Sequence, residues 1–294
     1  MISGYWEQII VFMGINSILA LGFYITFSTG QMSMCHGALM GIAAYTSGFL
    51  SLYTGIPFYL NLIISSLCSA LVGVIISYPT LHLKHFYLAV ATLGFGQIIV
   101  VIATATPALG GALGLTNIPY KTSILNVYTT LGIVSLFFFN LYKSRFWIAC
   151  NAIKDDEIAA SASGINAAQY KAITFAIGGF ITGIGGVYEI HYISSTLPHG
   201  YDIWKSVEIF LFPLIGGTEI FIGSIFGGFL LTLLPEVLRS VFRERMIIYG
   251  IILILIMIFR PQGLLDRQMM ERLIPYLRRK NLNLARNDRG SNGA

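Results

Sequence analysis

Charged residues are scarce in this chain. Asp, Glu, Lys and Arg make up 11% of its 294 residues, whereas hydrophobic residues make up 55%. A soluble globular domain carries about 25% charged residues, so this chain lacks the charge needed to cover a water-facing surface of its size. The composition therefore excludes a water-soluble domain and predicts a protein that lies mostly in lipid.

Several other features are missing, and each absence excludes a class of protein. The three cysteines, Cys35, Cys68 and Cys150, are odd in number and have no paired spacing, which excludes a disulfide framework. No Cys-x-x-Cys or His-x-x-x-His pair indicates a metal site. No Gly-x-x-x-x-Gly-Lys-[Ser/Thr] run occurs, so the chain itself is not expected to bind ATP phosphates. The start, MISGYWEQIIVF, lacks the basic flank of a signal peptide and is predicted to begin the first membrane segment.

Long apolar runs, in contrast, are abundant. They cover residues 8–27, 36–54, 57–77, 86–106, 123–142, 171–192, 203–216, 218–235 and 246–259. A run such as IIYGIILILIMIF (247–259) does not alternate between apolar and polar residues as a barrel strand does. We predict an all-α, polytopic helical membrane protein with about nine membrane segments, including a broken or re-entrant helix. Residues 1–259 form the predicted membrane domain, and 260–294 form a basic tail.

The tail determines the predicted orientation, because positive charge marks the cytoplasmic side. Counting segments back from a cytoplasmic C-terminus places 78–85 and 143–170 inside, and 54–57, 107–122 and 193–202 outside. Arg239, Arg243 and Arg245 disagree with this count, because they fall on the outer side. Orientation explains the basic tail sufficiently, so we reject nucleic-acid binding and prefer orientation to lipid recognition by the tail. Membrane lipids are expected as neighbours of the protein as a whole.

The loop 143–170 interrupts the apolar sequence with a short polar stretch. Asp155, Asp156 and Glu157 suit the first turn of an Ala-rich helix, where acidic residues favour the helix dipole. Gly164 can end that helix in a left-handed conformation. Asn166 and Gln169 are spaced as an N-cap with a capping-box partner that begins the next segment. The pattern predicts a short cytoplasmic helix and a sharp turn, which either docks a soluble partner or merely connects two segments.

The same loop resembles a known pattern. Ala159, Ala160 and Gly164 hold the Ala-Ala-x-x-x-Gly spacing of the EAA loop of ABC-importer permeases, with Glu157 displaced by one position because Ile158 intervenes. The longer run SRFWIACNAIKDDEIAASASGIN (144–166) is similar to the LivM-type permeases of branched-chain amino acid ABC importers. Further stretches at 30–50, 86–98, 109–119, 206–217 and 249–264 resemble the same family in the same order.

The chain also departs from that family at two places. In the outer loop, Leu109 and Leu113 stand where the family usually has polar residues. In the late turn, Glu219, Ile220 and Ser224 replace the usual Gly, Ser and Pro. These departures bear on the solute and on partner contacts.

The resemblance implies a permease subunit with the ABC-importer permease fold in a bacterial cytoplasmic (inner) membrane. Two ATP-binding cassette subunits would bind ATP and Mg, so this chain is expected to hold no cofactor. A second, LivH-like permease and a periplasmic or lipid-anchored solute-binding protein would complete the complex, which would work by alternating access. The implied ATPase-coupling residues are Asp155, Asp156, Glu157, Ala159, Ala160 and Gly164, and the implied binding-protein docking residues are Gly110, Gly111 and Gly114.

Polar residues within apolar segments are candidates for lining the solute path. They are Gln31, Ser33, His36, Gln97 and Glu208. The first three lie in the glycine-containing stretch 28–37, where unwound backbone at membrane depth must be buried in protein or face water. Simple helix packing is an equal alternative for Ser33 and His36, and Lys205 is a potential ion-pair partner of Glu208.

Two other function classes remain as alternatives. An ion-coupled secondary transporter needs ionisable residues near the membrane midplane, and the segments offer few besides Glu208. A membrane enzyme needs a convergent set of reactive side chains, and the sole such cluster is His191 and His199 near Glu189 and Asp202. Within the family itself, a solute such as urea or an amide is also compatible with the sequence.

Overall fold

The computed structural model describes residues 2–81, 83, 85–239, 245–260 and 263–265. Regular structure within these ranges is helical. The α-helices are α1 (Ile2–Phe27), α2 (His36–Tyr53), α3 (Phe58–Thr80), α4 (His85–Ala105), α5 (Ile124–Leu141), α6 (Arg145–Asp155), α7 (Glu157–Ala162), α8 (Ala167–Ile193), α9 (Ile203–Gly216), α10 (Phe221–Arg239) and α11 (Arg245–Phe259). Short 3₁₀ helices are η1 (Pro107–Leu109), η2 (Gly111–Leu113) and η3 (Pro198–Tyr201). The all-α prediction is therefore confirmed.

The number of membrane segments differs from the sequence prediction. Each of the nine apolar runs forms a helix, but only six helices of the described ranges (α1, α3, α4, α5, α8 and α10) are long and apolar enough to cross a membrane. The helices α9 and α11 have 14 and 15 residues, too few for a full span of about 20. Helix α2 contains several Gly, Ser and Thr residues, which lower its mean hydropathy. Most of it is buried against other helices, so few of its side chains have to face lipid. The prediction of about nine membrane segments is thus not confirmed.

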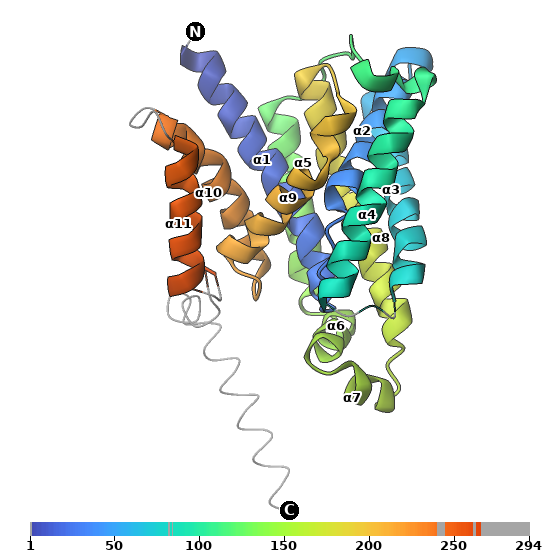
Figure 1. Cartoon of the computed structure of the whole chain (residues 1–294), viewed down its shortest axis with the longest axis vertical. Coiled ribbons are helices and arrows are strands. Elements are labelled where there is room, and N and C mark those ends of the chain that lie inside the picture. Colours follow the sequence, from blue (N-terminus) through green and yellow to red (C-terminus); the bar gives the residue numbers. More distant parts are fainter. Residues whose placement is uncertain (1, 82, 84, 240–244, 261–262, 266–294) are drawn as a thin grey trace, which may run out of the picture.

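The helices α1 and α8 lie at the centre of the bundle, where α8 packs against α1, α2 and α3 (Figure 1). Small residues allow this close approach. A Cβ atom added at Gly22 would lie 2.4 Å from Thr182 Oγ1, and one added at Gly186 would lie 2.3 Å from the Met40 carbonyl oxygen. Such contacts favour the packing role for the glycines of these helices.

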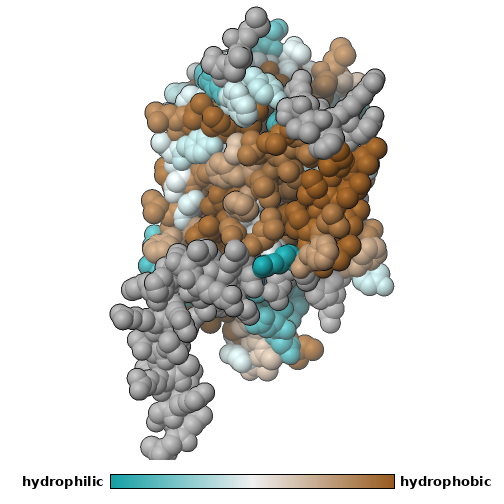
Figure 2. All heavy atoms as spheres, turned by 90° about the vertical axis from the view of Figure 1, so that its left-hand side faces the viewer, coloured by the Kyte–Doolittle hydropathy of each residue, from teal (hydrophilic) through white to brown (hydrophobic). Residues whose placement is uncertain are grey.

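The two ends of the bundle carry different elements. In Figure 1, α6 and α7 lie at the lower end, and the connections 107–122 and 193–202 lie at the upper end with the N-terminal end of α1. A broad hydrophobic band crosses the middle of the face seen in Figure 2, between more hydrophilic ends. The loops 143–170 and 107–122 thus lie at opposite ends of the bundle, as the sequence predicted. The basic tail from residue 266 onwards, and the charged residue Arg243, lie outside the described residues.

Candidate functional site

The helices α6 and α7 form a hairpin, here called the inner hairpin (residues 145–164). The Asp156 carboxylate Oδ1 accepts hydrogen bonds from the backbone N–H groups of Ile158 (2.9 Å) and Ala159 (3.1 Å), which caps α7. Gly164 follows α7 with φ of +85°, a conformation that favours glycine. Asn166 caps α8 by accepting from the Gln169 N–H at 3.2 Å. The predicted short helix, left-handed turn and new helix start are confirmed.

The inner hairpin exposes some of the predicted coupling residues and buries others. Asp155, Asp156, Ala159 and Gly164 are exposed. Ala160 is 4% exposed and packs with Ile153 and Ala167. Glu157 turns back to Lys171 of α8, with Nζ and Oε1 2.7 Å apart. The most exposed large hydrophobic side chain of the inner hairpin is Ile158, at 78%, which the sequence comparison treated only as an interruption.

Between α1 and α2, residues 28–35 are non-helical and are here called the broken segment. It is packed within protein: Ser28, Thr29, Gln31 and Ser33 are all buried. The backbone N–H of Met34 donates to Thr92 Oγ1 of α4 at 2.9 Å, so the segment reaches into the bundle. The expectation that unwound backbone here is buried is confirmed.

Gln31 of the broken segment and His36 at the start of α2 each have a buried side-chain nitrogen without a hydrogen-bond partner. His36 Nε2 lies 3.2 Å from Thr26 Oγ1, but His36 Nδ1 is buried without a partner. Gln31 Oε1 accepts from Thr29 Oγ1 at 3.2 Å, whereas Gln31 Nε2 is buried without a partner. Unsatisfied buried polar groups are costly. We therefore keep both as candidates for solute contact in another conformation, while Ser33, bonded to Cys35 at 3.1 Å, has a local structural role.

Lys154 connects the inner hairpin to the broken segment. Its Nζ lies 4.4 Å from the centre of the Phe27 ring, and its Cα would lie 3.5 Å from a Cβ added at Gly30. It also lines a cavity of about 310 Å³ together with Asp155 and Glu219. Burial lowers the pKa of Lys154, and the two carboxylates partly offset that effect. Lys154 therefore places the inner hairpin in direct contact with the broken segment, a link that sequence analysis missed.

The other two path candidates lie elsewhere. Gln97, on α4, is partly exposed. Glu208 Oε2 lies 3.2 Å from Lys205 Nζ, so the ion pair considered from the sequence is present. Lys205 also lies 3.8 Å from Glu189 Oε1 of α8, and both of these side chains are 14% exposed. The structure thus groups one cation with two carboxylates, of which Glu189 was not recognised as a partner.

The glycine-rich connection 107–122, here called the outer loop, is held against residues 191–196. Leu115 and Thr196 form an antiparallel bridge, in which the Thr196 N–H donates to the Leu115 carbonyl at 2.8 Å. The Ile118 N–H similarly donates to the Ser194 carbonyl at 3.1 Å. The predicted docking residues Gly110, Gly111 and Gly114 all have positive φ. They shape a loop that displays Leu113, 81% exposed, away from the bundle.

Replacing Gly114 by Ala is expected to break this loop geometry. The new Cβ would lie 1.8 Å from the Thr196 carbonyl oxygen, and the φ of +67° is itself unfavourable for Ala. Because backbone must move, we expect a destabilisation of about 2 kcal/mol or more, measured as a lower Tm of the detergent-solubilised protein. The matched change Gly132→Ala, where no atom lies within 4 Å of the new Cβ, should not lower the Tm, because Ala is the better helix former inside α5. Equal melting of both variants would contradict this account.

The cluster considered for an enzyme is structural. His191 Nε2 lies 3.0 Å from Ser47 Oγ, and His191 Nδ1 lies 2.8 Å from the Pro119 carbonyl. Asp202 caps α9 by accepting from the Trp204 N–H at 2.9 Å. Within the described ranges, no group of three His, Cys, Asp or Glu side chains is placed to hold a metal ion.

These features define a multi-pass helical membrane protein, with a capped hairpin at one end and a glycine-rich loop at the other. The chain belongs to the family described as "Branched-chain amino acid transport system / permease component", whose model matches residues 5–259. That family is a transport component rather than an enzyme family, and its members named below are permease proteins.

Individual relatives agree with this assignment. The high-affinity branched-chain amino acid transport system permease protein LivM of Escherichia coli K12 is 27% identical, over 93% of this chain and 70% of its own length. The probable branched-chain amino acid transport permease protein LivH of Methanocaldococcus jannaschii is 24% identical, over 91% of this chain and 94% of its own length. No solved structure matches the chain.

Proposed function

We propose that this chain is one permease subunit of an ABC importer for branched-chain amino acids in a bacterial cytoplasmic membrane, with its C-terminus in the cytoplasm. The observation that carries the proposal is the inner hairpin, which displays an apolar residue, Ile158, on a helix fixed by the Asp156 cap. Exposed apolar residues on a rigid element at one end of a membrane protein suit docking of a soluble partner.

The partners follow from this proposal. Two ATP-binding cassette subunits bind ATP and Mg. One docks on the inner hairpin of this chain and the other on the corresponding hairpin of a second, LivH-like permease. A periplasmic or lipid-anchored binding protein delivers the solute at the outer loop. When the ATPases close, they move the inner hairpin, and the contact of Lys154 with the broken segment carries this movement into the bundle. The solute path then opens alternately to the two sides of the membrane. The relatives' names and the family assignment support this arrangement.

The alternative of an ion-coupled transporter gains no support from Glu208. That carboxylate is 45% exposed and is paired with Lys205, which compensates its charge. A coupling site would need a carboxylate that is free to take up the ion.

Purification of the tagged chain from its native membranes in mild detergent tests the proposal. We expect two ATPases and a second permease to co-purify, and the complex in proteoliposomes to take up labelled L-leucine when ATP and the binding protein are supplied. Labelled urea and acetamide serve as controls for the related solutes. Recovery of the chain alone, with ATP-independent uptake, would refute the importer, whereas uptake of urea in place of leucine would change only the solute.

A further inference from the structure

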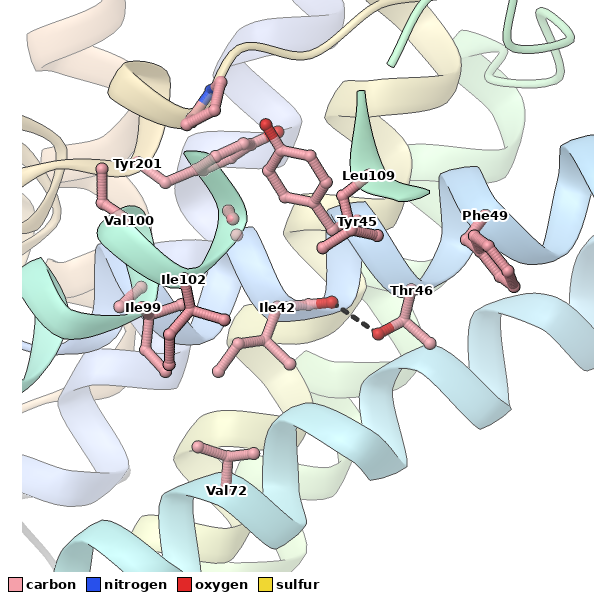
Figure 3. A pocket seen from close by; sticks show the side chains of 14 residues that line it. Ile42, Tyr45, Thr46, Phe49, Val72, Ile99, Val100, Ile102, Leu109 and Tyr201 are labelled. Carbon is pink, nitrogen blue, oxygen red and sulfur yellow. Dashed lines mark hydrogen bonds between the residues drawn. The ribbon is translucent and has the colours of Figure 1, made fainter. Parts of the chain in front are cut away.

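A second cavity lies at the opposite end from the inner hairpin and is here called the outer cavity. It has a volume of about 390 Å³, is partly open, and is lined by α2, α3, α4, the end of η1 and η3 (Figure 3). Its walls are almost entirely apolar: Ile42 of α2, Val72 of α3 and Ile99 of α4 point into it from three sides. The volume lies within the range of small-molecule sites. The proposed function so far gives this cavity no role.

The outer cavity has few polar groups. The Thr46 hydroxyl is used within α2, donating to the Ile42 carbonyl at 2.7 Å. The Tyr201 hydroxyl accepts from Thr196 Oγ1 at 3.0 Å. The Tyr45 hydroxyl is buried near Thr196 but forms no well-made hydrogen bond. The cavity therefore offers an apolar interior, and its hydroxyl groups are either hydrogen-bonded within the protein or buried.

The roof of the outer cavity is built from the segments that form the outer surface. Leu109 belongs to the outer loop, whereas Pro198 and Tyr201 belong to η3. The bridge between Leu115 and Thr196 ties these two segments together. A partner that docks on the outer loop and moves it therefore also moves the roof, so the cavity lies where a delivered solute would arrive first.

We propose that the outer cavity binds the uncharged aliphatic side chain of the transported solute, and that Ile42, Val72 and Ile99 set the size of side chain accepted. The inference rests on the proposed function and adds the residues that determine solute selectivity. An apolar solute group of four carbons fits such a site, and each methylene that matches or clashes changes selectivity by about 10- to 200-fold. A lipid acyl chain is the competing occupant, but lipid would not need a roof made of the outer loop segments.

The test compares two Val→Phe changes on α3 in the full complex with ATPases and binding protein, reconstituted in proteoliposomes. Val72→Phe fills the outer cavity, whereas Val74 is 40% exposed and points out of it, so Val74→Phe is the matched control. We expect Val72→Phe to reduce the preference for L-leucine over L-alanine at least tenfold in uptake competition, with unchanged subunit recovery. Ile42→Ala, which enlarges the cavity, should raise uptake of L-phenylalanine relative to L-leucine.

The outcomes separate this inference from the proposed function. Unchanged leucine preference in both Val72→Phe and Ile42→Ala, with normal uptake, would overturn the inference and leave the importer intact. A phospholipid that co-purifies with the wild type and is lost in Val72→Phe, without any change in selectivity, would assign the cavity to lipid and also overturn it. Failure of the wild type to transport any aliphatic amino acid would instead refute the proposed solute. If Val72→Phe does not assemble, Ile42→Ala decides alone.

Discussion

Replacing Ile158 by Asp is expected to release the ATPase subunits from this permease. The side chain is 78% exposed on the six-residue helix α7, so the change removes no packing from the chain itself. It places a carboxylate where the proposed interface is apolar and adds to the negative charge of its neighbours Asp155, Asp156 and Glu157. Hot-spot residues at the centre of an interface cost about 2 kcal/mol or more when changed. If Ile158 is such a residue, ATPase binding is weakened roughly thirtyfold. Co-purification and titration of the ATPase into the purified permease measure it.

The reciprocal variant Leu113→Asp provides the control. Leu113 is also exposed, at 81%, but lies in the outer loop at the other end of the bundle. It should leave ATPase binding intact and reduce the stimulation of ATP hydrolysis by the solute-loaded binding protein. Loss of ATPases in both variants would indicate general misfolding. Full ATPase binding in Ile158→Asp would refute the assignment of α7 as the docking helix.

The inner hairpin shows which features can be read directly from sequence. Asp156, Gly164 and Asn166 act on backbone groups two or three residues away, so residue type and spacing suffice to predict the cap and the turn. The apolar runs likewise predicted nine of the eleven α-helices of the described residues, all except α6 and α7 of the inner hairpin. An apolar run alone does not show whether a helix spans the membrane. The helices α9 and α11 come from apolar runs, but with 14 and 15 residues they are too short for a full span.

Residue roles that depend on distant contacts were not predictable in the same way. The spacing of Ala159 and Ala160 is the same in any helix, but only the packing of Ile153 and Ala167 shows that Ala160 faces inward. Lys154 looks like an ordinary surface lysine in the sequence, although its contact with Phe27 spans more than a hundred residues. Gly114 carried a signal of its own, since glycine in an outer loop favours a turn, but its close approach to Thr196 depends on how α8 ends.

The ion pairs of α9 lead to the second large expected effect, which concerns stability. Lys205 lies between Glu189 and Glu208, so Lys205→Met leaves two carboxylates without their cation, one of them on a side chain only 14% exposed. Removing one partner of a buried ion pair typically costs about 3–5 kcal/mol. We therefore expect the Tm of the detergent-solubilised protein to fall by roughly 5 °C or more, measured by thermal unfolding at neutral pH.

Variants of the two carboxylates, Glu189 and Glu208, distinguish a structural role of the ion pairs with Lys205 from a role in coupling transport to an ion. If the cluster is structural, adding Glu189→Gln to Lys205→Met should recover part of the lost Tm, because it removes the buried uncompensated charge. Glu208→Gln alone should have a small effect, since that side chain is 45% exposed and its removal leaves Lys205 paired with Glu189. A Glu208→Gln variant that keeps its Tm but loses a dependence of uptake on protons or sodium would contradict this account. The charge at Glu208 would then take part in transport, and the mechanism would be ion-driven although the chain belongs to a family of permease components.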